Sequence, residues 1–196
     1  MDAKSRFRDG YVRRLAEGLA KEHVAVEAAE HIIEGGEALG GGTTQEERAQ
    51  WMAEAMRRMD TLLDESTRRA VRERCACCLG GKRHKLSQEI ARDNETLEAR
   101  IRAANETPYV FGHSVSRADD GRVLVSFMPD GWPHYGCACL RKATEPISIT
   151  YCHCCGGHVK RHLQTALGRK VEVAVQSSAL SSGGNEPCRF LCRIVE

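Results

Sequence analysis

Cysteines and histidines concentrate in three short segments of this sequence. The densest segment, residues 151–162, carries three cysteines and three histidines. A C-x-C-C group occupies residues 75–78, and a C-x-C pair occupies residues 137–139. Thiolates and imidazoles are the ligands that zinc and similar borderline metal ions prefer, and a thiolate is also a nucleophile. The spacing therefore predicts a metal or thiol site but does not select one reaction.

Two zinc arrangements fit the spacing. In the first, the C-x2-C pairs at residues 75–78 and 152–155 come together and supply four thiolates. In the second, a helix starting near Cys154 carries Cys155, His158 and His162 at offsets of three and four, and Cys137 or Cys139 completes the site. Whether the clusters form one site or two stays open. The candidate metal ligands are Cys75, Cys78, Cys137, Cys139, Cys152, Cys155, His158 and His162.

Several metal and cofactor classes fit the pattern less well than zinc. A zinc-protease helix needs a glutamate directly after its first histidine, and Val159 follows His158 here. No C-x-x-C-H run for covalent haem attachment is present. An iron–sulfur cluster would use the abundant thiolates, but the neighbouring histidines favour zinc.

The alternative chemistry is nucleophilic catalysis. A cysteine in the first turn of a helix has a lowered pKa because the free backbone amides stabilise its thiolate. Cys154 and Cys155 are candidate nucleophiles on this ground, with His153, His158 or His113 as the candidate base. Cys188 and Cys192 alternate with apolar residues on a predicted strand, which indicates core packing for both.

Composition limits the class of protein. A chain of 196 residues with 41% hydrophobic residues can bury a core of its own, and a net charge of +2 argues against a dedicated nucleic-acid surface. No apolar run is long enough to span a membrane. The first eight residues are charged and lead into no signal-like segment, so we expect a cytoplasmic location. In that compartment cysteines are more often metal ligands, reactive thiols or buried apolar residues than members of disulfides.

Hydrophobic periodicity and turn residues predict an α+β protein. N-terminal helices should pack with a C-terminal antiparallel sheet that is crossed by one helix, which runs from about Cys154 to Leu167 and stops at Gly168. Residues 1–105 form a helical part carrying the first cysteine cluster, and residues 106–196 form an α+β part that resembles a ligand-binding domain, together one compact unit. Further helices are expected over 9–34 with a break near 21–23, over 44–74, and from Ser87 to before Pro108. Strands are expected over 109–115, 122–127, 147–151, 171–175 and 188–195.

The last part of the chain resembles a known group of domains. A helix ending in Ala166-Leu167-Gly168, the alternating strand 171–175 and Cys188-x-Phe190 in a final strand are similar to vinyl-reductase-type ligand-binding domains. The resemblance implies helices packed on an antiparallel sheet, with a small apolar ligand held between them. A similar ending occurs in the family that includes thiazoline-carboxylate hydrolases. The whole chain looks like a cysteine-rich bacterial family of unassigned activity, in which the C-H-C-C-G-G-H type segment and the segment 79–83 recur.

Together these patterns predict a cytoplasmic zinc-binding protein that holds a small ligand or acts as a sensor. The alternative is a hydrolase of a small carbon–nitrogen or sulfur-containing substrate, using a cysteine nucleophile or zinc-bound water. A third reading is a structural, metal-stabilised interaction module. The sequence leaves open whether the protein is an enzyme and how many copies assemble.

Overall fold

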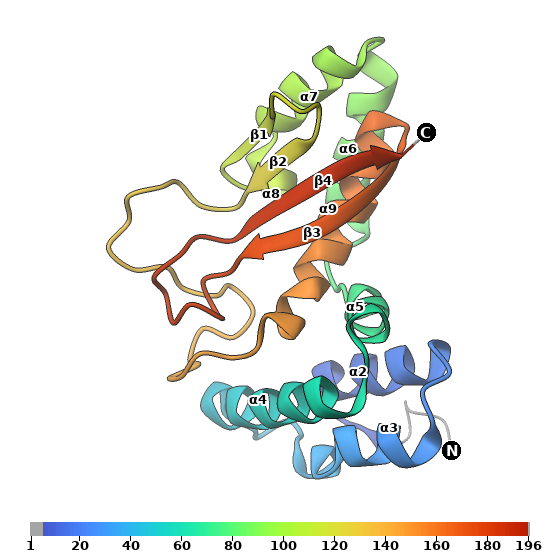
Figure 1. Cartoon of the computed structure of the whole chain (residues 1–196), viewed down its shortest axis with the longest axis vertical. Coiled ribbons are helices and arrows are strands. Elements are labelled where there is room, and N and C mark those ends of the chain that lie inside the picture. The colour runs from blue at the N-terminus through green and yellow to red at the C-terminus, as the bar shows by residue number, and fades with distance from the viewer. Residues whose placement is uncertain (1–5, 196) are drawn as a thin grey trace.

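The computed structural model describes residues 6–195, and it has the expected α+β architecture (Figure 1). An N-terminal group of helices lies at one end, and a four-stranded sheet with its covering helices lies at the other. Most of the charged first residues, which contributed to the expected location, lie outside the described part. In residues 6–195 no helix is long and apolar enough to cross a membrane.

The N-terminal helices begin and end largely where their capping residues place them. Asp9 caps α2, and His23, with φ 54°, lies in the predicted break before α3. Thr44 and Glu47 form the predicted capping box of α4. The expectation of one helix over 44–74 is wrong, because the Asp64 side chain accepts from the Thr67 amide and starts a new helix. The elements are α2 (Gly10–Lys21), α3 (Val26–Ile33), η1 (Gly36–Ala38), α4 (Gln45–Leu62) and α5 (Glu65–Arg74).

The middle of the chain is more helical than predicted. Ser87 lies inside a helix rather than at its start, and the predicted strand 109–115 instead begins as a helical turn. Pro108 fits the first helical position, and Gly112 ends the turn with φ 81° against Phe127, where a side chain would collide. These elements are α6 (Gly81–Asp93), α7 (Leu97–Asn105) and α8 (Pro108–Phe111).

The sheet is antiparallel throughout, with strand order β1-β2-β4-β3. Val125 pairs with Phe190, which pairs with Val175, so apolar residues align across its centre. The predicted strand 147–151 is wrong: Ser148 caps a 3₁₀ turn there by accepting from the Thr150 amide. The elements are β1 (Ser114–Arg117), β2 (Val123–Ser126), η2 (Ile149–Cys152), α9 (His153–Leu167), β3 (Lys170–Ser177) and β4 (Arg189–Val195).

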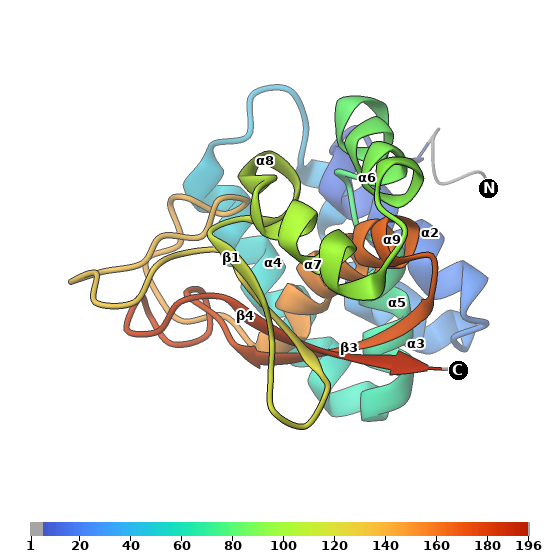
Figure 2. The same ribbon diagram turned by 90° about the horizontal axis from the view of Figure 1, so that it is seen from above.

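Helix α9 is the crossing helix that the sequence predicted, and it links the two ends of the molecule. It packs on β3 and, with α7, covers one face of the sheet, while α6 packs on α9 (Figure 2). Its first turns also contact α5, and Gly168 ends it in the left-handed conformation. One buried cluster gathers the N-terminal helices and Tyr151, and a second gathers the sheet with α6 to α9. The start of α9 therefore lies between two cores.

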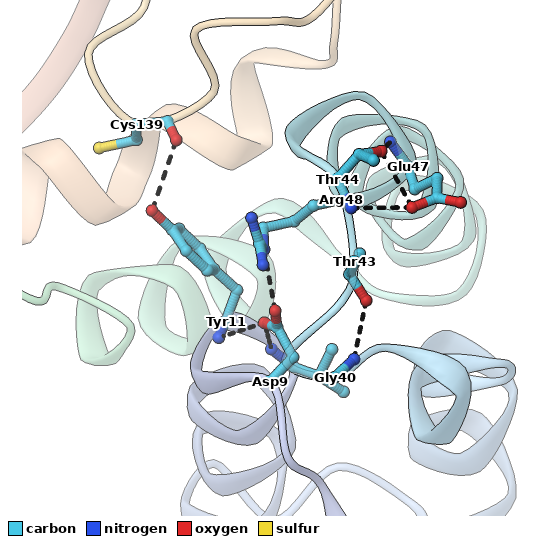
Figure 3. Close-up of polar contacts among 9 residues, drawn as sticks. Asp9, Tyr11, Gly40, Thr43, Thr44, Glu47, Arg48 and Cys139 are labelled. Atoms are coloured by element: carbon cyan, nitrogen blue, oxygen red, sulfur yellow. Dashed lines mark hydrogen bonds and ion pairs between the residues drawn. The ribbon is translucent and has the colours of Figure 1, made fainter.

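A set of polar contacts joins the N-terminal helices to the long loop between β2 and η2. The Tyr11 hydroxyl, on α2, donates to the Cys139 carbonyl at 3.4 Å (Figure 3). Asp9, which is almost fully buried, accepts from the Tyr11 amide and from Arg48 at 2.8 Å. The Tyr11 bond links α2 to the loop that carries the second cysteine group, and the Asp9 contacts join the start of α2 to α4.

Candidate functional site: a cysteine-lined pocket

A cavity of about 310 Å³ lies where the start of α9, the β2–η2 loop and the α5–α6 connection meet. Its wall is mostly apolar, and no aspartate or glutamate of residues 6–195 lines it. This volume is at the lower end of the range for small-molecule sites. Eight of the ten cysteines in the chain are part of the wall: Cys77, Cys78, Cys137, Cys139, Cys152, Cys154, Cys155 and Cys188.

Four of these cysteines lie near enough to shift one another's pKa, and we call them the thiol cluster (Cys137, Cys139, Cys154 and Cys155). The neighbouring thiols of Cys137 and Cys155 hold the pKa of Cys139 well below its ordinary value. The Cys155 thiol also lowers the pKa of Cys154 in spite of burial. The same neighbours raise the pKa of Cys137 and Cys155. The cluster therefore favours thiolates at Cys139 and Cys154, with protons kept by their neighbours.

Arg72 supplies a buried positive charge beside the thiol cluster. The residue is only 3% exposed, its Nη2 donates to the Tyr151 carbonyl at 3.2 Å, and its guanidinium lies 4.7 Å from the Tyr151 ring centroid. Burial alone would lower the pKa of Arg72, but Cys75, Cys154 and Tyr151 raise it above its usual range. No carboxylate of the described residues pairs with Arg72. A buried cation without an anion is costly, so the arrangement favours the Cys154 thiolate as its counter-ion.

The two helix histidines are engaged with backbone carbonyls. His158 has Nε2 at 2.8 Å from the Val110 oxygen and Nδ1 at 3.2 Å from the Cys78 oxygen. His162 has Nε2 at 2.8 Å from the same Cys78 oxygen and Nδ1 at 3.0 Å from the Ser87 hydroxyl. A neutral His162 with its proton on Nε2 satisfies both of its bonds when Ser87 donates to Nδ1. Both rings therefore fix the α5–α6 connection onto α9, and in this arrangement neither presents a free nitrogen to the pocket.

A protein-family model described as a family of unknown function (DUF6144) matches residues 13–195. The chain belongs to this family. No curated protein matches the chain, and no solved structure does. The match includes the N-terminal helices as well as the sheet, and all the residues that line the pocket fall inside it.

The structure brings together part of the predicted ligand set. Cys137, Cys139 and Cys155 meet in the thiol cluster, together with Cys154, which was predicted as a nucleophile. Cys78 lies at the exposed rim, with its sulfur next to that of Cys77 at 3.6 Å. Three predicted ligands have other partners: Cys152 contacts the Ser178 hydroxyl at 2.8 Å, and His158 and His162 bond to carbonyls.

Cys75 and His153 stand apart from the group. The Cys75 sulfur faces the Val71 and Arg14 carbonyls within the N-terminal core, so the pairing of two C-x2-C knuckles does not form. Burial lowers the pKa of His153, which is not part of the pocket wall. Within residues 6–195 no three cysteine, histidine, aspartate or glutamate side chains are arranged to hold a metal ion.

Sequence reasoning missed two contributors to the site. Arg72 lies in a helix rich in arginine, and nothing in the local sequence marks it as the buried one. Cys188 was expected in the core, but it lines the pocket just before β4 begins. Cys192, by contrast, is fully buried as expected, and burial raises its pKa to about 12.

The buried His162 makes stability depend on pH. Burial lowers the pKa of His162 to about 4, whereas an unfolded histidine titrates near 6.5. The unfolded chain therefore binds more protons between these values, so this contribution is fully present above pH ~6.5 and is lost as the pH falls towards 4. We expect the free energy of unfolding to fall between pH 7 and 5 less steeply in His162→Gln than in the wild type. The control is His31→Gln, which changes an exposed histidine and should keep the wild-type slope.

Proposed function

We propose that the protein binds a small, mostly apolar ligand in the cysteine-lined pocket, where the ligand lies against thiolates of the thiol cluster. The observation that carries this proposal is the coincidence of an apolar cavity, four neighbouring cysteines in its wall and the buried Arg72 at one place. An apolar wall binds the body of a ligand, and a few placed polar groups orient it. The likeness of the chain's last part to small-ligand-binding domains, noted from the sequence, points the same way. A sensor or carrier in the cytoplasm is the role that we propose.

Filling the pocket tests this proposal. Ala138 is exposed and lines the wall, so a tryptophan there can occupy the cavity without entering either core. Native mass spectrometry of the purified wild-type protein should show a bound small molecule that Ala138→Trp lacks. Asp119→Trp, on the exposed β1–β2 turn, is the matched control and should keep the molecule. A wild-type protein without a bound molecule, or an Ala138→Trp variant that keeps the molecule, would contradict the proposal.

A zinc ion held by the thiol cluster is the second candidate. Its support is the meeting of a C-x-C pair and a C-C pair, two segments that together offer four thiols. Four thiolates around Zn²⁺ carry a net charge of −2, and the buried Arg72 would offset part of it. Because no group of three ligand side chains converges in the described residues 6–195, the cysteine side chains would have to rotate around the ion. An iron–sulfur cluster would need the same thiols and is the weaker proposal, because the chain also offers histidines.

Elemental analysis of protein purified without added metal tests the zinc candidate. We expect close to one zinc per chain in the wild type and in Cys77→Ser, which changes an exposed cysteine outside the cluster. Cys139→Ser should lose most of the metal. Wild-type protein that contains no stoichiometric zinc, with every thiol titrating freely, would exclude this candidate.

Catalysis has less support than binding. A cysteine hydrolase needs a base beside its nucleophile, and in residues 6–195 no hydrogen bond joins an imidazole to a thiol. The nucleophile candidates Cys154 and Cys155 lie in the pocket wall, but the candidate base His153 does not. The alternative of a small-substrate hydrolase would gain support if ligands of the pocket were turned over.

A further inference from the structure

The pocket has an exposed basic part and a buried sulfur-rich part. Arg83 is the one arginine in its wall, and Tyr109, also in the wall, is 52% exposed. Lys82 is exposed beside them. Tyr151 and Cys152, at the sulfur-rich part, are buried. A ligand that fills the cavity therefore meets a cation near solvent and thiols deeper inside.

The Arg83 side chain is held in place with part of its guanidinium unused. Its Nε donates to the Tyr109 carbonyl at 3.1 Å, and its guanidinium carbon lies 4.3 Å from the Tyr109 ring centroid. Lys82 approaches the same ring, with Nζ at 5.3 Å from the centroid. The two terminal nitrogens of Arg83 have no hydrogen-bond or ion-pair partner among residues 6–195. An arginine fixed in this way presents a planar fork whose geometry matches a carboxylate.

An anionic ligand in this pocket requires a cation in the wall. Arg72 is not part of the wall, and its guanidinium donates to the Tyr151 carbonyl. A ligand anion would place a charge in an apolar space, which is unfavourable unless a cation pairs with it. Among residues 6–195, Arg83 is the cation in the wall that is placed to do so.

We propose that the ligand of this pocket is an apolar carboxylate, whose carboxylate pairs with the terminal nitrogens of Arg83 while its apolar body lies among Val110, Phe127 and Phe190. This inference rests on the proposed ligand-binding function and adds the chemical class of the ligand. The aromatic and aliphatic side chains would bind the apolar body of an acid and of a neutral molecule equally well. Arg83 would distinguish the acid from a neutral molecule of the same shape.

Two fluorescent probes with one apolar body separate the two claims. The probes are naphthalene-2-carboxylate and 2-naphthalenemethanol, titrated into the full-length wild-type protein, Arg83→Met, Arg83→Lys and Lys85→Met. In the wild type we expect the carboxylate to bind about tenfold or more tightly than the alcohol, as befits a charge-assisted bidentate pair. Arg83→Met should remove that preference and leave the affinity for the alcohol unchanged. Arg83→Lys keeps the positive charge but not the planar pair of donors, so it should keep only part of the preference for the carboxylate.

Lys85→Met is the matched control, because Lys85 lies on the same helix, reaches Glu89 at 3.9 Å and is not in the wall. It should bind both probes like the wild type. If both probes bind equally to the wild type, the inference is overturned and the ligand-binding function stands. The same holds if the preference survives in Arg83→Met. If neither probe binds, both the inference and the proposed function are contradicted for ligands of this size.

Discussion

Replacing Gly157 with alanine should lower the free energy of unfolding by about 2–3 kcal/mol, the size expected for an overpacked contact between helices. A Cβ at this position would overlap the carbonyl oxygen of Glu73 and lie 2.9 Å from its Cα. Both are backbone atoms of α5, so neither can rotate away. The helices would have to separate where α9 begins, and denaturant unfolding of the purified variant measures the cost.

The neighbouring Gly156 provides the matched control. A Cβ there would meet Val175 at 3.6 Å and Val173 at 3.9 Å, which are ordinary contacts. Gly156→Ala should therefore stabilise the protein by about 0.5–1 kcal/mol, because alanine loses less backbone entropy than glycine in a helix. Opposite signs at adjacent positions would support the close approach of α5 and α9. Equal effects of the two substitutions would contradict it.

Replacing Arg72 with methionine should reduce the rate at which Cys154 is alkylated at neutral pH by about tenfold or more, since one pKa unit changes the thiolate fraction tenfold. The Cys155 thiol lowers the pKa of Cys154 most, and Arg72 lowers it further; methionine removes the second effect while filling a similar volume. Because Cys154 can take up a proton once the cation is gone, no unpaired buried charge remains and the variant should stay folded. Timed labelling followed by mass spectrometry of the peptides measures the rate.

Arg74→Met is the control for this experiment. Arg74 ends the same helix, is half-exposed and pairs with Glu22, so its removal should leave the labelling of Cys154 unchanged. If Cys154 is alkylated as fast in Arg72→Met as in the wild type, then Arg72 does not stabilise the Cys154 thiolate.

Local signals predicted much of the fold. Asp9, the Thr44–Glu47 capping box and Gly168 fixed helix ends that the structure confirms, because caps act through neighbouring backbone groups. The errors arose where local patterns are ambiguous. Residues 147–151 and 109–115 are rich in β-branched and aromatic residues, yet Ser148 and Pro108 start turns there. Strand propensity mainly reflects fit to a pleated, half-buried surface, and these residues pack elsewhere.

The sequence predicted which residue types form the candidate site but not which of them contact one another. The clustering of the cysteines indicated that they belong to a site, and the helix pattern placed Cys154 and Cys155 in the first turn of α9. Which sulfurs meet depends on how the β2–η2 loop folds back, and the contact from Tyr11 to the Cys139 carbonyl spans 128 positions of sequence. Arg72 could not be identified as buried without knowing how α5 and α9 pack.

We expect the pocket to contain a thiolate at Cys139, and a competition among the cysteines tests this expectation. Wild-type protein with a chelator present is pulsed with iodoacetamide at pH 6, and each cysteine-containing peptide is quantified by mass spectrometry. Cys77 and Cys78 are exposed, and burial raises the pKa of Cys77 to about 11, whereas the pKa of Cys139 is lowered. Cys139 should therefore be labelled well before Cys77. Labelling that follows exposure instead, with Cys77 and Cys78 first and Cys139 later, would contradict it.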